Sequence, residues 1–166
     1  MNSRIGAALA LAAVAFVPLA CGTQPEEQQH EQQALTGDPD APEGIAVTNG
    51  RLLLAPVSGN PAAVYFDIAN SGPEQVVIRA AHVEGAEMAM IHETSTIDGR
   101  ATMHDIDEQP VAAGETVRFA PGGLHVMAME PADTLTPGSE TVVTLTFESG
   151  DKVSFSADVR SAGDER

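Results

Sequence analysis

Residues 141–147 read Thr-Val-Val-Thr-Leu-Thr-Phe, so polar and apolar side chains alternate along this stretch except at Val142-Val143. Successive side chains of a strand point to opposite faces of a sheet, and this alternation is therefore typical of a half-buried β-strand. The turn-forming residues Ser149-Gly150-Asp151 follow soon after it. The stretch predicts β structure in this part of the chain.

A similar pattern of short β-prone runs extends over the chain from Ile45 onward. Short runs rich in Val, Ile, Thr and Phe alternate with turn residues such as Asn49-Gly50 and Asp98-Gly99, and no segment has a sustained helical period. Many short strands at regular spacing favour an antiparallel sandwich or barrel. The expected strands are Ile45–Thr48, Arg51–Ala55, Ala63–Ala69, Gln75–Val83, Ala89–Thr96, Arg100–Ile106, Thr116–Ala120, Leu124–Met129, Thr141–Phe147 and Lys152–Val159. We predict one all-β domain over residues 45–160, with a short polar tail at 161–166.

The first residues differ in character from the rest. Residues 1–20 contain one positive charge, Arg4, and a short apolar run, which is typical of a secretory signal peptide. The stretch Pro18-Leu19-Ala20-Cys21 resembles a bacterial lipobox, in which the cysteine takes lipid and becomes the mature N-terminus. The alternative is cleavage near Ala20, which would leave Cys21 as an unpaired thiol in an oxidising compartment.

Residues 21–44 are rich in Gln, Glu, Pro and Gly. Such a segment buries too little apolar surface to offset the entropy lost on ordering, so we predict a flexible tether. His30 lies within it and is interpreted as a solvated residue. The expected location is the bacterial periplasm, with the chain anchored to a membrane through lipid on Cys21.

The composition excludes several classes of function. The chain carries 24 acidic and 8 basic residues, a formal net charge of −16, which argues against a nucleic-acid partner. A single cysteine excludes an intrachain disulfide and any zinc or iron–sulfur cage built on cysteines. No G-x-S-x-G motif is present, and Glu93 and His92 are strand neighbours that point to opposite faces. We therefore expect a binding protein and not an enzyme.

A hairpin places one histidine and one methionine on a common face. If Asp98-Gly99 forms a two-residue turn, Thr94 faces Met103 and His92 faces Asp105 across the two strands. His92 and Met103 are then diagonal neighbours, about 7–8 Å apart at the backbone. The adjacent His104 falls on the opposite face.

His125 and Met127 are separated by one residue, so in an extended segment they also share a face. Two histidines and two methionines can therefore meet on one ion if the two segments approach each other. Thioether sulfur is soft and selects Cu(I), and imidazole also suits copper. Hard oxygen ligands do not dominate the set, which argues against Ca²⁺ and Mg²⁺. We predict one Cu(I) per chain.

Three further methionines, Met88, Met90 and Met129, lie close in sequence to the predicted ligands. Methionine in a β domain is usually a filler of core space, which is the interpretation favoured for Met88, Met90 and Met129. Met88 and Met90 nevertheless share a strand face with His92, and they are placed to shield bound copper.

The spacing of the four residues is H-x10-M-x21-H-x-M, which resembles the signature of the periplasmic Cu(A) copper chaperone family. The resemblance covers about Ile45 to Val159. It implies a cupredoxin-like Greek-key β-barrel or sandwich that binds Cu(I) through His92, Met103, His125 and Met127. It also implies delivery of copper to the oxidase subunit that carries the Cu(A) centre of cytochrome c oxidase, beside a Sco-type thiol protein.

Two features depart from the family pattern. The first strand region, which often holds a tryptophan in this family, reads Arg51-Leu-Leu-Leu, and the chain ends without a tail rich in His and Met.

Two other functions stay open at this point. One is envelope copper binding for uptake or tolerance, and the other is a structural domain without stoichiometric copper.

Overall fold

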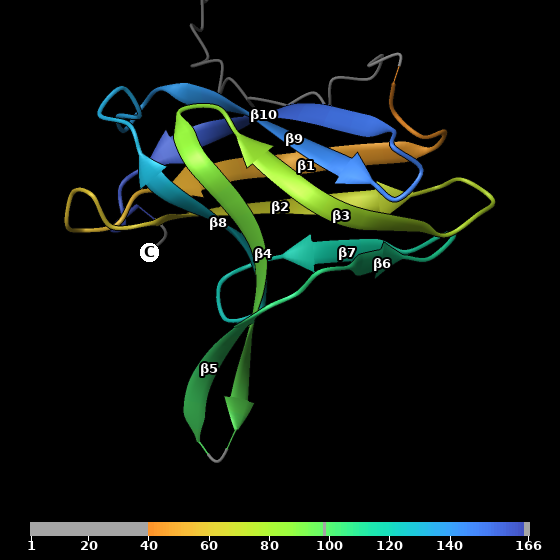
Figure 1. Ribbon diagram of the computed structural model, residues 1–166, viewed down its shortest axis with the longest axis horizontal. Coiled ribbons are helices and arrows are strands. Elements are labelled where there is room, and N and C mark those ends of the chain that lie inside the picture. The colour runs from red at the N-terminus through yellow and green to blue at the C-terminus, as the bar shows by residue number, and fades with distance from the viewer. Residues whose placement is uncertain (1–39, 98, 165–166) are drawn as a thin grey trace, which may run out of the picture. The chain divides into compact units, whose positions relative to one another are not determined.

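The computed structural model describes residues 40–97 and 99–164, and every regular element within them is a strand (Figure 1). The strands are β1 (Ile45–Leu53), β2 (Ala62–Asn70), β3 (Val76–Val83), β4 (Ala86–Ile97), β5 (Arg100–Asp105), β6 (Gln109–Val111), β7 (Thr116–Phe119), β8 (Leu124–Pro131), β9 (Glu140–Phe147) and β10 (Lys152–Arg160). The all-β class predicted from the alternating pattern is confirmed.

The strands form one continuous hydrogen-bonded path in the order β5-β4-β8-β2-β1-β10-β9-β3-β6, while β7 pairs with β2. All of these pairings are antiparallel except that of β1 with β10. The sheet curls, so that β3 and β4, which follow each other in the chain but not in the path, pack together. This curling gives two layers with a core between them.

The core is aliphatic and aromatic. The rings of Phe66 and Phe119 stack with their centroids 4.2 Å apart, and Leu145 is fully buried nearby in the same cluster. The alternation in 141–147 is observed, although Thr141 lies on the buried side, where its hydroxyl donates a hydrogen bond of 2.7 Å to the carbonyl of Glu84. Val142 consequently points outward.

One local prediction about the strands was wrong, and one strand was not predicted. The expected strands at 45–48 and 51–55 are one strand, β1, because Asn49 and Gly50 form a bulge and not a turn. Asn49 adopts the left-handed conformation, with φ of 58°, and its side chain donates to Asp67 at 2.8 Å. The short strand β6 was not predicted because it contains Pro110, which cannot donate to a ladder.

The hairpin of β4 and β5 projects away from the rest of the domain (Figure 1). The first part of β4 pairs with β8, and the remainder continues outward with β5, whose residues are all exposed. His92 and Glu93 have partners on both sides, β5 and β8. These two residues therefore mark the base of the hairpin.

The loop between β7 and β8 also lies at this base. β7 pairs with residues 66–69 of β2, and β8 pairs with residues 62–64 of the same strand. Residues 120–123 form the loop that connects β7 to β8. The backbone N–H of Gly123 donates to Ala120 at 3.1 Å, and that of Ala120 donates to Leu124 at 2.8 Å. These two hydrogen bonds make the loop a tight turn, and β8 begins directly after it, paired with β4.

The predictions about the N-terminal part fall largely outside the described residues. These are the signal peptide at 1–20, the lipidated Cys21, His30 and most of the tether. Within the described part, Asp40 and Gly44 accept backbone hydrogen bonds of 2.8 Å from Lys152 and Ser71. No helix long and apolar enough to cross a membrane occurs among the described residues.

Candidate metal centre

His92 and His125 lie directly opposite each other on β4 and β8. Their ring centroids are 5.8 Å apart, and the ring planes meet at 68° in an edge-on arrangement. The next pair on the same face, in the direction away from the hairpin, is Met90 opposite Met127. The fold therefore brings three of the four predicted ligands, His92, His125 and Met127, onto two adjacent strands.

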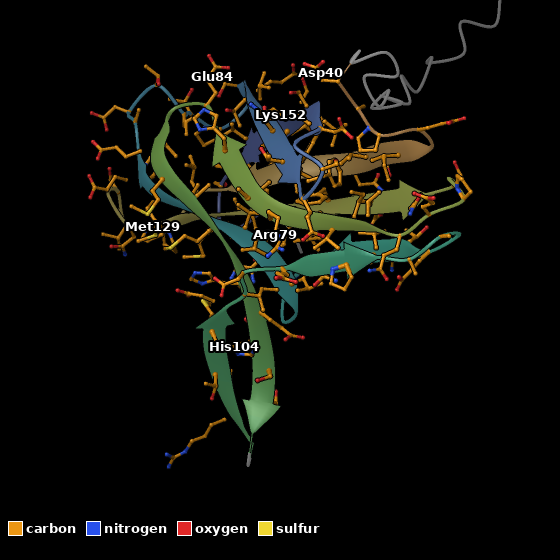
Figure 2. All side chains as sticks on the ribbon, turned by 45° about the vertical axis from the view of Figure 1, so that its right-hand side comes forward. Asp40, Arg79, Glu84, His104, Met129 and Lys152 are labelled. Atoms are coloured by element: carbon orange, nitrogen blue, oxygen red, sulfur yellow. The ribbon has the colours of Figure 1, made fainter. Side chains whose placement is uncertain are left out.

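The fourth predicted ligand comes from the hairpin. The register derived from the Asp98-Gly99 turn is confirmed, because Thr94 pairs with Met103 and His92 pairs with Asp105. Met103 thus shares the face of His92 and is half exposed. His104, labelled in Figure 2, pairs with Glu93 on the other face, where His104 Nε2 lies 3.3 Å from a Glu93 carboxylate oxygen.

The ring nitrogens of His92 lack hydrogen-bond partners although both are buried. Nε2 lies 2.9 Å from an oxygen of Asp105, but the alignment of the two groups does not make a hydrogen bond. A buried polar atom without a partner costs free energy. A cation bound by an imidazole nitrogen would remove that cost, and the Asp105 carboxylate adds favourable charge beside it.

His125 is held in a defined orientation. Its Nδ1 lies 3.0 Å from the carbonyl oxygen of Gly123, and its side chain is buried. A carbonyl can only accept, so this contact requires the proton on Nδ1 and leaves the lone pair on Nε2. Histidines that bind metals are commonly oriented in this way, through a hydrogen bond from the other ring nitrogen.

The Gly123 carbonyl was missed by the reasoning from sequence. The same oxygen also accepts from the backbone N–H of Thr94 at 3.1 Å, so it connects β4, β8 and the His125 ring. The turn-forming residues Pro121-Gly122-Gly123 signalled a turn at this place, but the direction of a carbonyl is set by the tertiary fold.

Tyr65 of β2 was also missed. Its ring centroid lies 6.2 Å from that of His125, and the guanidinium carbon of Arg51 lies 5.1 Å from the Tyr65 centroid. Tyr65 therefore packs beside His125 on the side away from His92. No pattern in the sequence places Tyr65 there, because the pairing of β2 with β8 joins segments far apart in the chain.

The interpretation of Met88, Met90 and Met129 as core residues was wrong. The hydrophobic core of the described residues, including the partly buried side chains packed against it, contains no methionine. Met88 lies opposite Met129 on the outer face, one pair beyond Met90 and Met127. Every described methionine is therefore on the face that carries His92 and His125.

The donor set determines which ions suit this face. Among the described residues, no three or more His, Cys, Asp or Glu side chains are grouped as a metal site. Ion binding here would consequently depend on thioether sulfur as well as imidazole. Such a mixed set suits a soft monovalent ion better than Zn²⁺ or Ca²⁺.

The fold is that of the PCuAC domains. It is similar to the "Copper-bound PCuAC domain from PmoF2", with a TM-score of 0.58 and 21% identity over 73% of this chain and 96% of that one. It is also similar to the structure "apo-DR1885 from Deinococcus radiodurans", with a TM-score of 0.56 and 23% identity over 95% and 100% of the two chains. The predicted cupredoxin-like sandwich and the resemblance to the copper chaperone family are thereby confirmed at the level of fold.

The family follows from a direct match of sequence. Residues 45–159 match the family described as "Putative lipoprotein LpqE-like", and the chain belongs to this family. It is 34% identical over 89 residues to the "Putative lipoprotein Lxx21020" of Leifsonia xyli subsp. xyli (strain CTCB07). That match covers 53% of this chain and 54% of the relative, so the chain spans about half the length of the curated relative it matches.

Proposed function

We propose that this chain is an exported Cu(I) metallochaperone that holds one Cu(I) through His92, Met103, His125 and Met127 and delivers it to the Cu(A) centre of cytochrome c oxidase. The observation that carries the proposal is the pairing of His92 with His125 on the face that also holds Met127 and Met103. Both ring nitrogens of His92 are buried there without hydrogen-bond partners.

The properties of this site suit transfer of an ion better than its permanent storage. The site lies on an outer face at the base of a projecting hairpin, and Met103 is half exposed. Its four donors are neutral, so no thiolate holds the ion tightly or is exposed to oxidation. A partner that offers thiolates is therefore able to exchange ligands with the bound ion.

The names of similar proteins also support copper as the ion. One structure of similar fold is named as a copper-bound domain, and another is named "CuI-DR1885 from Deinococcus Radiodurans". The family and the relative are both described as lipoproteins, which supports export and a lipid anchor on Cys21 in the periplasm. The oxidase subunit and a Sco-type thiol protein are the proposed partners.

Copper binding is tested by anaerobic titration of the chain with Cu(I) against a chromophoric chelator. Because Cys21 offers a competing thiol, the reference protein and the ligand variant described below both carry Cys21→Ser. We expect one tightly held Cu(I) per chain in this background. Adding His92→Ala, Met103→Leu, His125→Ala and Met127→Leu together should weaken binding more than about 100-fold, equivalent to roughly 2.7 kcal/mol. Equal affinity of the two proteins would overturn the ligand set.

Delivery is tested separately in a deletion strain of the native host. We expect deletion of the gene to lower oxidase activity. The wild-type gene should restore that activity, and the variant lacking all four donors should not. Copper tolerance is measured in the same strains. If tolerance is lost while oxidase activity is intact, delivery to the oxidase is wrong and the role in copper uptake or tolerance replaces it.

A further inference from the structure

A ladder of three side-chain pairs crosses the outer face of β4 and β8. His92 lies opposite His125, Met90 opposite Met127, and Met88 opposite Met129. Successive pairs on one face of a strand are about 6.6 Å apart along it, so the last pair lies about 13 Å from the histidines. Figure 2 labels Met129, which lies away from the tip of the β4–β5 hairpin.

The packing of the sheet does not explain this row of thioethers. The positions between the methionines point inward, where Ala128 is fully buried and Ala89 packs against the core. Outward positions of a strand in an acidic protein are ordinarily polar. Met88 is instead 57% exposed, among the most exposed of the large apolar side chains described.

We infer that Met88, Met90 and Met129 form a second Cu(I) site, built from thioethers alone, from which the ion passes to the His92 and His125 site. The inference rests on the proposed function, because it supplies a route to the first site. Met88 and Met129 are directly opposite, and Met90 is the diagonal neighbour of Met129. Three neutral sulfur donors select Cu(I) over harder ions, and without imidazole they hold it more weakly.

The pair of Met90 and Met127 connects the two sites. Directly opposite residues of an antiparallel pair are about 4.5–5.5 Å apart at Cα, within reach of two flexible methionine side chains. Cu(I) passes by exchanging its bond to Met90 sulfur for one to Met127 sulfur. The ion stays Cu(I), and neither an electron nor a proton moves.

The test follows the methionine methyl groups by NMR in the full chain, labelled with [¹³C-methyl]methionine. The chain carries Cys21→Ser, because a thiol would capture a soft metal first. Ag(I) serves as the probe, since it is soft and does not change oxidation state under these conditions. Single Met→Leu variants assign the signals, and they keep side-chain volume nearly constant.

We expect the first equivalent of Ag(I) to shift the methyl signals of Met103 and Met127. The second equivalent should shift those of Met88, Met90 and Met129. The double variant Met88→Leu, Met129→Leu should weaken binding of the second equivalent at least tenfold and leave the first unchanged. Val142→Leu is the matched control, because it alters an outward aliphatic residue of β9 and should change neither step.

The possible failures are distinguishable. If Met103 and Met127 respond to the first equivalent but Met88, Met90 and Met129 do not respond to the second, the thioether site is wrong and the proposed function stands. If Met103 and Met127 do not respond at all, the proposed function is overturned. An unchanged second step in the Met88→Leu, Met129→Leu variant would also overturn the thioether site.

Discussion

Met103 and His104 are adjacent in the chain but lie on opposite faces of β5. Met103 shares its face with His92 and His125, whereas the His104 ring lies against the Glu93 carboxylate. A histidine is the more familiar copper ligand, so a choice based on residue type alone would favour His104. The pleat of the hairpin places Met103, and not His104, on the face of the two other histidines, so Met103 is the predicted ligand.

The two residues give a paired prediction. Met103→Leu should weaken Cu(I) binding at least about tenfold, or roughly 1.4 kcal/mol, because it removes a soft donor from a set of four. His104→Ala should leave the affinity almost unchanged. Competition with a Cu(I) chelator measures both variants. Equal losses would contradict the face assignment, since a slip of one residue exchanges the two faces.

The orientation of His125 gives a second prediction at this scale. Because Nδ1 donates to the carbonyl of Gly123, the neutral ring should carry its proton on Nδ1 in the metal-free protein. Long-range ¹H–¹⁵N correlation spectra of the imidazole distinguish the two tautomers. On addition of Cu(I), the Nε2 resonance should shift and the Nδ1 resonance should remain that of a protonated nitrogen. A proton on Nε2 in the metal-free state would contradict this arrangement.

At the scale of elements, the predictability of the site depends on how far apart the paired strands are in the chain. The register of β4 and β5 was predictable because a two-residue turn leaves one way to pair the flanking residues. The register of β4 and β8 was not, because the segment between them is long and contains three other strands. The sequence pattern placed His125 and Met127 on a common face, and the tertiary fold placed that face beside His92.

The bulge in β1 shows the same limit. Asn49-Gly50 is a typical two-residue hairpin signal, yet here both flanking segments pair with β2 and the chain continues in one direction. The asparagine takes the left-handed conformation that would also have suited a turn. Local propensity was satisfied in either case, so only the partners of the strand decide between turn and bulge.

The bulge makes a prediction about stability. A Cβ at Gly50 would lie 2.5 Å from the carbonyl oxygen of Ser156 and 2.8 Å from the ring of Phe155. Gly50→Ala should therefore cost about 1–3 kcal/mol of unfolding free energy. Gly163→Ala is the control, because nothing lies within 4 Å of its added Cβ, and it should change stability by less than about 0.5 kcal/mol. Urea denaturation measures both, and equal stabilities would contradict the close packing of β1 on β10.

At the scale of the whole molecule, the core and the candidate metal centre use different residues of the same strands. In β4 and β8 the inward residues Ile91, Val126 and Ala128 belong to the core, and the outward ones are the histidines and methionines. Substitutions of the exposed Met88 and Met103 are therefore able to change metal binding with little loss of stability, whereas His125 is buried and contacts the Gly123 carbonyl. A methionine variant of this face that loses copper should therefore still be folded.

Attachment to a membrane is the last property at this scale, and it concerns Cys21, outside the described residues. The net charge of −16 disfavours contact of the domain with anionic head groups, so attachment should depend on lipid at Cys21 alone. Cys21→Ser should move the protein from the membrane pellet of its native host to the supernatant. The wild-type protein should stay in the pellet after a wash with 1 M salt, because salt screens charge but not a lipid anchor. Wild-type protein found in the supernatant would contradict lipidation and favour plain cleavage near Ala20.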